Sequence, residues 1–436
     1  MNTFAPSVPW QPCARTDWPA VPVKYMFETV LGKMLQPQPS SNEDVEAPYI
    51  KSLHVQWRGV NFEDLPTMWA SPTDIEQLSL QAGDLMVCEG GEVGRGALVL
   101  NDPPVHCIFQ NALHRVRARE SNDVRYLNYC LKQASEAGWF DVLCNRATIA
   151  HFTVEKFREL RIHLPSGEHQ SLIANQLDRE TARIDGLIAE KERMLALLEE
   201  KRVALISRVV TRGLDPNAPL KPSGQEWLGE IPAHWDVCQL KRTWASSDYG
   251  LSESIRDEGD IAVLRMSCIV DGQVDTSKSG MIEEVDNRLL LRQNDLLFNR
   301  TNSLDQIAKV GLVDFDPEEP LTFASYLVRI RANHRAMPQY LVALLNASLF
   351  LEFARKNAIP AIGQANLSPT RYGEIHIPLP PQAEQEKIVT FLAQDAKISG
   401  PAREHIRSSI DLLKERRAAL ITAAVTGQIA LEEMTE

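Results

Sequence analysis

Several features that would assign a chain to a special class are missing from this sequence of 436 residues. No apolar run approaches the ~20 residues that a membrane-spanning helix needs, which excludes a typical membrane protein. Residues 1–18 lack a basic start followed by an apolar core, so we expect no secretory signal. The seven cysteines include no C-x-x-C pair, which argues against a disulfide framework or a zinc site and fits the reducing cytoplasm.

Known catalytic patterns are also missing. Residues 90–96 are rich in glycine but form neither a Walker A motif nor a dinucleotide-binding fingerprint, and we interpret them as a turn. Residues 101–105 (NDPPV) are similar to the D-P-P-aromatic motif of amino-methyltransferases, but Val105 replaces the aromatic residue that would stack on a flipped base. His106 and Cys107 have no further ligands at metal-site spacing. We expect no active site and no metal site, with a degenerate DNA methyltransferase as one alternative.

Composition places the chain among ordinary soluble proteins. Hydrophobic residues make up 44% and charged residues 24%, which excludes wholesale disorder, and the length predicts two or more domains. The formal net charge of −12 argues against nucleic acid when taken alone. However, residues 105–165 hold nine basic against six acidic residues, and residues 321–378 hold six against two. Because phosphate contact needs only a local basic face, these two stretches favour DNA binding.

The chain is a tandem repeat of two large copies. Residues 197–211 (LLEEKRVALISRVVT) and 412–426 (LLKERRAALITAAVT) lie 215 residues apart and are identical at nine of fifteen positions. With small gaps the alignment extends upstream and pairs Asp84 with Asp295, Arg125 with Gln339, Leu164 with Leu379 and Gln170 with Gln385. Each copy is long enough for its own core, so we expect two similar modules rather than a solenoid.

Each copy ends in a long helical stretch with an apolar seam, which predicts that the two helices pack on each other as an antiparallel coiled coil. The seam residues, which we expect to serve this packing or partner binding, are Leu177, Ile184, Ile188, Leu195, Leu198, Leu205, Leu392, Ile406, Ile410, Leu413 and Leu420. Asp185-Gly186 aligns with Gly400-Pro401, which predicts that both helices break at the same place.

The residues before each helical stretch predict mixed α and β structure. Apolar runs predict strands over 261–266, 295–298 and 326–330, and the periodicity of 340–356 predicts a helix. The predicted order is a first globular domain over 1–165, a central helical spacer over 166–212, a proline- and glycine-rich linker over 213–235, a second globular domain over 236–378 and a C-terminal helical spacer over 379–436. The expected fold class is α+β: two mixed α/β domains separated and joined by two long helices, in a pseudo-two-fold tandem repeat.

Several stretches resemble the specificity subunits of type I restriction-modification systems. They are 83–95 (GDLMVCEGGEVGR), 227–235 (WLGEIPAHW), the helix starts at 164–170 and 378–385, and the helix ends at 210–213 and 425–427. Residues 363–368 (GQANLS) resemble the family's loop before the last strand of a target recognition domain. Copy one departs from the pattern there, with 148–153 (TIAHFT) in its place. The resemblance covers essentially the whole chain, including the repeat.

The resemblance implies that each globular domain is a target recognition domain that binds one half of a bipartite double-stranded DNA sequence. The helices would set the half-site spacing and dock two modification (methyltransferase) subunits in equivalent positions. The chain itself would be non-catalytic and without a cofactor. S-adenosylmethionine would belong to the modification partners, and ATP with Mg²⁺ to restriction (motor and nuclease) subunits. No membrane is implied.

Polar side chains near the basic stretches are the candidates for base contacts, because Arg binds guanine and Asn or Gln binds adenine in the major groove. The candidates in copy two are Arg265, Asn299, Arg300, Gln364, Asn366 and Arg371. The candidates in copy one are Arg58, Arg95, Asn145, Arg146 and His151. The second alternative is a non-catalytic scaffold whose two modules bind only proteins, against which the two basic stretches argue.

Overall fold

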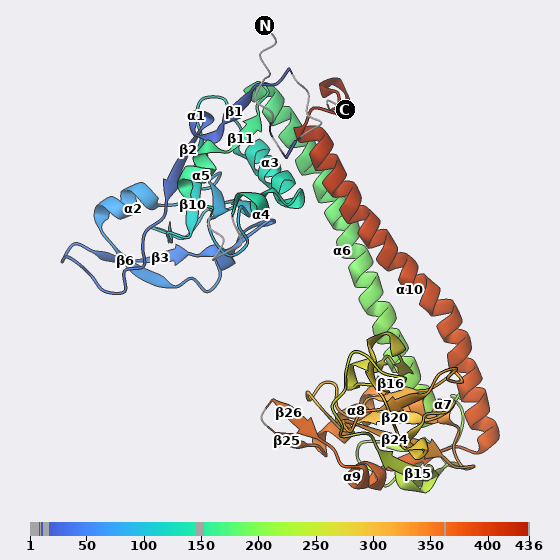
Figure 1. The fold of residues 1–436 in the computed structure, drawn as a ribbon. Coiled ribbons are helices and arrows are strands. Elements are labelled where there is room, and N and C mark those ends of the chain that lie inside the picture. The colour runs from blue at the N-terminus through green and yellow to red at the C-terminus, as the bar shows by residue number, and fades with distance from the viewer. Residues whose placement is uncertain (1–7, 9, 12–16, 145–151, 362, 435–436) are drawn as a thin grey trace. The chain divides into compact units, whose positions relative to one another are not determined.

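Two long helices, α6 (Gly167–Arg212) and α10 (Gln382–Val425), contribute to both units into which the chain folds (Figure 1). The computed structural model describes residues 8, 10–11, 17–144, 152–361 and 363–434. Unit 1 combines residues 1–192 with 408–436, and unit 2 comprises residues 193–407. Each unit is therefore a globular part with one segment of each long helix. Within the described residues, no helix is both long and apolar enough to cross a membrane.

Unit 1 is built on a four-stranded antiparallel sheet of order β2-β10-β7-β8. A second sheet, β6-β3-β9, packs on one face of it, and β1 pairs with β11 and β4 with β5. The strands are β1 (Ala20–Pro22), β2 (Phe27–Leu31), β3 (Val45–Ile50), β4 (Val55–Gln56), β5 (Gly59–Val60), β6 (Thr67–Ala70), β7 (Leu85–Cys88), β8 (Gly96–Leu98), β9 (Ile108–Phe109), β10 (Leu113–Ala118) and β11 (Arg161–His163). The helices before α6 are α1 (Val23–Met26), α2 (Pro72–Leu78), α3 (Val124–Glu136), α4 (Trp139–Leu143) and α5 (Val154–Glu159), with a 3-10 turn at Ser52–His54.

Unit 2 is built on a six-stranded sheet of order β15-β24-β20-β22-β18-β17, beside sheets β19-β16-β23 and β21-β26-β25 and the pairs β12-β13 and β14-β27. The strands of the large sheets are β15 (Trp244–Tyr249), β16 (Ile261–Leu264), β17 (Ile269–Val270), β18 (Gln273–Val274), β19 (Gly280–Ile282), β20 (Leu296–Asn299), β22 (Val310–Leu312), β23 (Leu321–Phe323) and β24 (Leu327–Ala332). The others are β12 (Leu220–Pro222), β13 (Glu230–Pro232), β14 (Asp236–Gln239), β21 (Thr301–Asn302), β25 (Ile359–Ala361), β26 (Gln364–Asn366) and β27 (His376–Leu379). The short helices are α7 (Pro338–Leu345), α8 (Ser348–Lys356) and α9 (Pro369–Glu374), with 3-10 turns at 240–243, 266–268, 276–278 and 287–289 and, in unit 1, at 431–434.

The sequence repeat is a repeat of topology. In unit 2, β15-β24-β20-β22 corresponds to β2-β10-β7-β8 of unit 1, and β19-β16-β23 corresponds to β6-β3-β9. The correspondence extends to strand direction, since β3 and β16 are each antiparallel to one neighbour and parallel to the other. Each unit thus repeats one mixed fold of helix and sheet.

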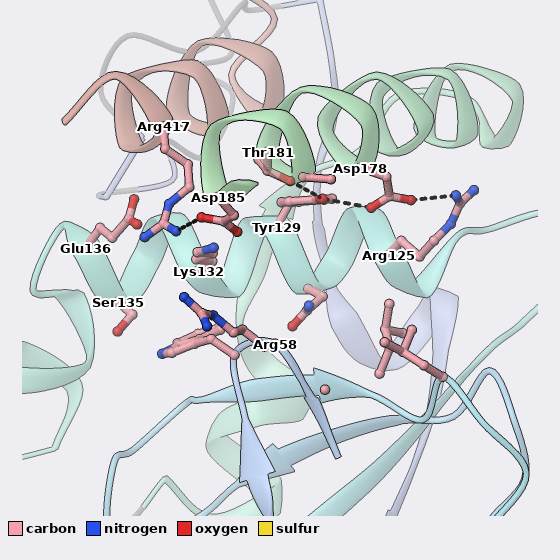
Figure 2. A pocket seen from close by; sticks show the side chains of 16 residues that line it. Arg58, Arg125, Tyr129, Lys132, Ser135, Glu136, Asp178, Thr181, Asp185 and Arg417 are labelled. Carbon is pink, nitrogen blue, oxygen red and sulfur yellow. Dashed lines mark hydrogen bonds and ion pairs between the residues drawn. The ribbon is translucent and has the colours of Figure 1, made fainter. Parts of the chain in front are cut away.

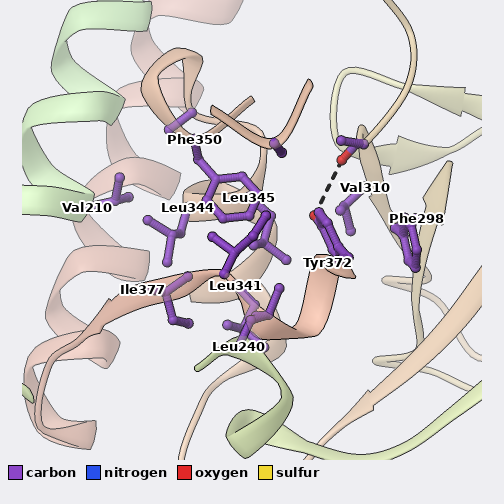
Figure 3. Close-up of a cluster of buried hydrophobic side chains, with 14 of the residues drawn as sticks. Val210, Leu240, Phe298, Val310, Leu341, Leu344, Leu345, Phe350, Tyr372 and Ile377 are labelled. Atoms are coloured by element: carbon purple, nitrogen blue, oxygen red, sulfur yellow. Dashed lines mark hydrogen bonds between the residues drawn. The ribbon is translucent and has the colours of Figure 1, made fainter. Parts of the chain in front are cut away.

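The main sheet of each unit lies between two apolar clusters. Alternate residues of β20 show this arrangement, because Leu297 faces a cluster shared with β16 and β23, whereas Leu296 and Phe298 face the helices. The helix-side cluster of unit 2 includes Val210 of α6, Leu341 of α7 and Tyr372 of α9 (Figure 3). The globular part and the long helices of each unit therefore share one core.

One tyrosine in each unit ties the globular part to both long helices. The Tyr126 hydroxyl donates towards the carbonyl oxygens of His163, just before α6, and Val425, at the end of α10, at 2.7 and 3.3 Å. In unit 2 the Tyr340 hydroxyl lies 3.1 Å from the carbonyl oxygen of Pro378, just before α10, and 3.2 Å from that of Val210 near the end of α6. Both rings are fully buried, and burial raises the pKa of both phenols. In each unit the start of one helix therefore lies beside the end of the other, so the segments pair antiparallel.

A buried glutamine reinforces this junction. Gln170 of α6 accepts a hydrogen bond from the Asp123 backbone amide, just before α3, and donates one to the Pro165 carbonyl. Gln385 of α10 makes the equivalent bonds with the amide of Met337, just before α7, and the Pro380 carbonyl. The residues that reveal the repeat in the sequence are thus those that join each globular part to a long helix.

The structure confirms the α+β fold class with paired long helices, but it corrects the predicted helix breaks. Both helices run without interruption through Gly186 and Pro401. Both positions lack packing of their own, since Gly186 has open space around it and Pro401 is exposed. The helices continue because their inner faces are buried and ion-paired, as in the Arg403–Glu199 pair at 3.1 Å, and tertiary packing outweighs the weak local propensity.

The helix predicted over 340–356 is also corrected, because it is two helices. α7 ends at Leu345 and α8 starts at Ser348. Between them, the Asn346 side chain accepts a hydrogen bond from the Val310 amide and donates one to the Val310 carbonyl. This bond pair fixes the end of α7 to β22. The three predicted strands are confirmed as β16, β20 and β24.

The tyrosine junction predicts the cost of losing a hydroxyl. Tyr340→Phe should lower the free energy of unfolding by about 1–3 kcal/mol, because the buried O–H proton that the Val210 and Pro378 carbonyl oxygens share is lost. Denaturant unfolding of the purified chain measures this change. Tyr326→Phe is the matched control and should have little effect, since Tyr326 is 46% exposed. Equal stabilities for both variants would contradict the role of the Tyr340 hydroxyl.

The uninterrupted α10 predicts a stabilising substitution. Pro401→Ala should raise the free energy of unfolding by roughly 1–3 kcal/mol, because alanine restores a backbone donor and removes the ring's clash with the preceding turn. Denaturant unfolding with circular dichroism measures both stability and helix content. A loss of stability would show that the chain needs a break at this residue.

Candidate nucleic-acid interface

A small sheet in unit 2 brings several of the base-contact candidates together. β26 lies between β21 and β25, with Thr301 opposite Asn366 and Asn302 opposite Ala365. The Asn366 amide donates to Thr301 Oγ1 at 2.9 Å, which leaves the Asn366 carbonyl oxygen as an acceptor, and Gln364 is exposed. Gly363 has a φ of 72°, which the turn between β25 and β26 requires and which favours glycine.

Arg300 lies where this small sheet leaves the main sheet. Its backbone amide donates to the Tyr326 carbonyl, and its carbonyl accepts from the Leu367 amide. Its guanidinium lies 5.0 Å from the centre of the Tyr249 ring, and Nη1 is 3.5 Å from the Ser325 carbonyl oxygen. Tyr249 and Tyr326 are about half exposed, so the half-buried arginine packs on one accessible aromatic ring and is bonded to the backbone of a second accessible tyrosine. A cation packed on an aromatic face is held in place while keeping donors for a base or a phosphate.

The sequence analysis missed these two tyrosines. Neither has a distinctive sequence pattern, and only the pairing of β15 and β24 with β20 brings them to Arg300. Arg371 of α9 is exposed at the same end of the small sheet, where its Nη1 lies 3.5 Å from the Asn357 carbonyl oxygen. Arg300, Gln364, Asn366 and Arg371 thus all lie on the small sheet or on the segments that adjoin it.

The other two candidates of unit 2 have internal contacts. The Asn299 side chain is buried and donates to the Met266 carbonyl at 3.5 Å. Arg265 is half-buried against Gly280, where a Cβ atom would lie 2.5 Å from a guanidinium nitrogen. Gly280 thus makes room for Arg265, and neither candidate belongs to the surface around Arg300.

The candidates in unit 1 are spread more widely. Asn145, Arg146 and His151 lie outside the described residues. Arg95 pairs with Glu92 at 2.6 Å and donates to the Ser52 carbonyl, and its side chain is only 12% exposed. Arg58 is exposed at the turn between β4 and β5. Internal contacts thus hold Arg95, as they hold Asn299 in unit 2, and both residues stay predictions as base contacts.

Glu89 in unit 1 takes the position of Arg300. Its backbone amide donates to the Ala112 carbonyl and its carbonyl accepts from the Phe152 amide, as for Arg300 in unit 2. The carboxylate lies 3.9 Å from Nε2 of the fully buried His114. Burial lowers the pKa of His114, so the ring is neutral at pH 7, and Nε2 donates to the Phe152 carbonyl at 3.0 Å. The two units therefore differ in charge sign at one equivalent position.

Several arginines of the two basic stretches do not contribute to an exposed basic surface. The charge count from the sequence therefore overestimates the positive charge available to DNA. Arg115 on β10 and Arg329 on β24 are buried and donate to backbone carbonyls. Two residues further along each strand, Arg117 pairs with Asp84 at 2.5 Å, and Arg331 pairs with Asp295 at 2.7 Å. These four arginines hold the loops before β7 and β20 to the main sheets. This role has a signal in the sequence: both copies contain an R-x-R pattern, at 115–117 and at 329–331, and both contain the aspartate that pairs with it, Asp84 or Asp295.

The residues of the predicted helix seam lie on the inner sides of the long helices. Five of them are buried: Leu177, Ile184, Ile188, Ile406 and Ile410. The other six are half-buried: Leu195, Leu198, Leu205, Leu392, Leu413 and Leu420. Polar residues complete the contact, as in the ion pair between Asp185 and Arg417 in unit 1.

Residues 101–105, the basis of the methyltransferase alternative, form a surface loop between β8 and β9. Val105 is 79% exposed there. Within the described part of the chain, no group of three or more His, Cys, Asp or Glu side chains could hold a metal ion.

A family model described as the type I restriction modification DNA specificity domain matches residues 36–193 and 235–398. The two matches cover most of the chain and fall one in each copy of the repeat. The chain belongs to this family. Members of the type I specificity family are the non-catalytic recognition components of their systems, in agreement with the sequence resemblance.

Named relatives support the assignment to the specificity family. The putative type I restriction enzyme MjaX specificity subunit of Methanocaldococcus jannaschii is 27% identical over 209 residues, or 46% of this chain and 47% of the relative. The StySPI specificity subunit of Salmonella potsdam is 21% identical over 436 residues, or 96% of this chain and 90% of the relative. The chain thus spans about half of the first relative and most of the second.

A solved structure shows the same fold. A chain from a structure of complex assembly and conformational transition of the type I restriction-modification system matches with a TM-score of 0.69 at 14% identity. The match covers 95% of this chain and 99% of that chain. At this identity the likeness concerns the specificity-family fold alone.

The surface around Arg300 predicts a loss of sequence discrimination. Arg300→Ala or Gln364→Ala should reduce discrimination at one base pair by ~1–3 kcal/mol, because a bidentate base contact is lost. Binding of the assembled complex to the target duplex and to its single-base variants measures this. Arg288→Ala, an exposed arginine paired with Asp286, is the control and should leave discrimination unchanged. Equal weakening on every sequence would instead identify a phosphate contact.

Proposed function

We propose that this chain is the DNA-recognition subunit of a type I restriction-modification complex. The observation that carries this proposal is the double match of the specificity-domain model, one match in each copy of the repeat. In the proposed organisation, the target recognition domains are residues 1–165 and 236–378, the helical spacers are 166–212 and 379–436, and the linker is 213–235. Each recognition domain binds one half of a bipartite double-stranded target.

Physical differences between the two units support binding to two different half-sites. The units share a topology but carry Glu89 and Arg300 at equivalent positions. A carboxylate accepts from the cytosine amino group, whereas a guanidinium donates to guanine, so such domains select different bases. The proposed DNA contacts are Arg58, Arg95, Asn145, Arg146, His151, Arg265, Asn299, Arg300, Gln364, Asn366 and Arg371.

The partners in this proposal are two modification subunits, docked on the long helices, and restriction subunits in the complete system. The chain carries no cofactor of its own. S-adenosylmethionine acts in the modification subunits, and ATP with Mg²⁺ acts in the restriction subunits. The complex works in the cytoplasm, where it meets the DNA.

Modified-base sequencing tests the proposed function directly. DNA from cells that express this chain with its modification partner should contain a new adenine-methylated motif in two parts with a fixed gap. A strain with the partner but without this chain is the control and should lack the motif. Absence of any motif, with the partner present and soluble, would favour the protein-binding scaffold instead.

A further inference from the structure

Each unit contains a groove between its long helices and its globular part. Groove 1, of about 500 Å³, is lined by α3, the unit 1 segments of α6 and α10 and the turn between β4 and β5. Groove 2, of about 520 Å³, is lined by α7, the unit 2 segments of α6 and α10 and the turn between β17 and β18. These are equivalent elements of the repeat, so the two grooves are equivalent sites.

The equivalence can be followed residue by residue. The tyrosine junctions align Tyr126 of α3 with Tyr340 of α7, which places Asn128 opposite Val342 and Tyr129 opposite Ala343 in the alignment. The offset of 215 residues along the long helices pairs Asp178 with Ala393, Thr181 with Ala396, Asp185 with Gly400 and Arg417 with Arg202. The lining of the two grooves can therefore be compared position by position.

A polar network fills part of groove 1 (Figure 2). The Tyr129 hydroxyl donates to Asp178 at 2.7 Å and lies 3.3 Å from Thr181 Oγ1, and Arg125 pairs with Asp178 at 2.9 Å. Asp185 of α6 pairs with Arg417 of α10. The wall of groove 1 is thus made of charged groups that already bind one another.

Groove 1 also holds a half-buried lysine. Lys132 lies between the Asp185–Arg417 pair and Arg58 in Figure 2. Burial lowers the pKa of Lys132, and the nearby Arg417 and Arg58 lower it further, against the opposing effect of Glu136 and Asp185. An apolar segment entering this groove would have to desolvate these cations, which is costly.

Groove 2 has lost this network and is apolar. Alanines 343, 393 and 396 replace the tyrosine, aspartate and threonine of groove 1, and Val342 replaces the asparagine. The apolar lining includes Val203, Ile206, Ile269, Leu312, Val342, Val389 and Leu392. Val203 is 46% exposed although it lies in this lining. Large apolar side chains left accessible in a groove mark a surface for a partner.

The lining of groove 2 carries a small excess of carboxylates. Asp271, Asp314 and Asp395 face the two cations Arg202 and Lys309, whereas the fourth carboxylate, Glu199, is already paired with Arg403 at 3.1 Å and Arg407 at 3.4 Å. Arg202 corresponds to Arg417 of groove 1, but the residue equivalent to Asp185 is Gly400, so Arg202 lacks that partner and lies 4.0 Å from Glu199. The three other carboxylates favour a segment with basic residues beside its apolar face.

We propose that groove 2 docks an apolar segment with basic flanks from a modification subunit, and that groove 1 cannot bind the same segment with comparable affinity. This inference rests on the proposed function, in which two copies of one modification subunit bind this chain. One segment cannot match both an apolar groove and a groove whose wall consists of paired charged groups. The two copies are therefore held unequally, and the copy at unit 2 binds first and more tightly.

A pair of matched variants tests this inequality. Ala393→Asp introduces a charge into groove 2, and Ala182→Asp makes the same change in groove 1; both alanines are exposed helix residues, so the chain should fold in both cases. Titration of the full-length chain with the modification subunit, followed by native mass spectrometry, counts the bound copies. We expect Ala393→Asp to weaken the first association at least about tenfold, a change of ~1.4 kcal/mol, and Ala182→Asp to leave it unchanged.

The outcomes separate the inference from the function on which it rests. The inference is overturned if the folded Ala393→Asp chain binds the first modification subunit with wild-type affinity, or if both variants weaken this binding equally. Either result leaves the proposed function intact. A wild-type chain that binds no modification subunit overturns the proposed function itself.

A photo-crosslinking residue in place of Val203 identifies the occupant of groove 2 in the assembled complex. The expected product joins it to an apolar segment of the modification subunit that has lysine or arginine at its flanks. A product with DNA, with a second copy of this chain or with an acidic segment overturns the proposal.

Discussion

The hydroxyl groups of Tyr126 and Tyr340 are the contacts on which the arrangement of each unit depends. Each hydroxyl meets one carbonyl just before a long helix and another at the end of the other long helix. A buried hydroxyl with two acceptors fixes the register of these segments because any shift would leave polar groups without partners in the core. The buried glutamines 170 and 385 fix the neighbouring helix starts in the same way. The globular part of each unit is thereby held rigidly against its segments of the long helices.

Much of the fold could be predicted from the sequence because the repeat preserves these junction residues. Leu164-Pro165, Gln170 and the Tyr-Leu of α3 recur in the second copy because both units need the same internal bonds. The predicted helix breaks at Gly186 and Pro401 are wrong because packing and ion pairs between the helices outweigh the low helix propensity of these residues. The division of 340–356 into two helices depends on Asn346 and its contact with β22, which is distant in sequence.

The site was less predictable than the fold because side chains of one chemical type serve two purposes. Arg300 and Arg331 are both arginines of the second copy, yet one packs on an exposed tyrosine and the other on Asp295. Charge counting cannot separate these cases, because Arg331 lies within β24 beside the loop before β20, whereas Arg300 lies just after β20 ends. These neighbours become visible only when the strands are placed in their sheet.

The composition of unit 1 determines the order in which the protein can be completed during synthesis. Its core includes Ile421, Ala424 and Val425 beside Tyr126 and Leu177, and 299 residues separate Tyr126 from Val425. Unit 2, in contrast, is one continuous stretch. A growing chain therefore has all of unit 2 before it has the last part of unit 1. The globular part that leaves the ribosome first therefore completes its core last. Until then, part of its apolar surface stays exposed to other binding partners.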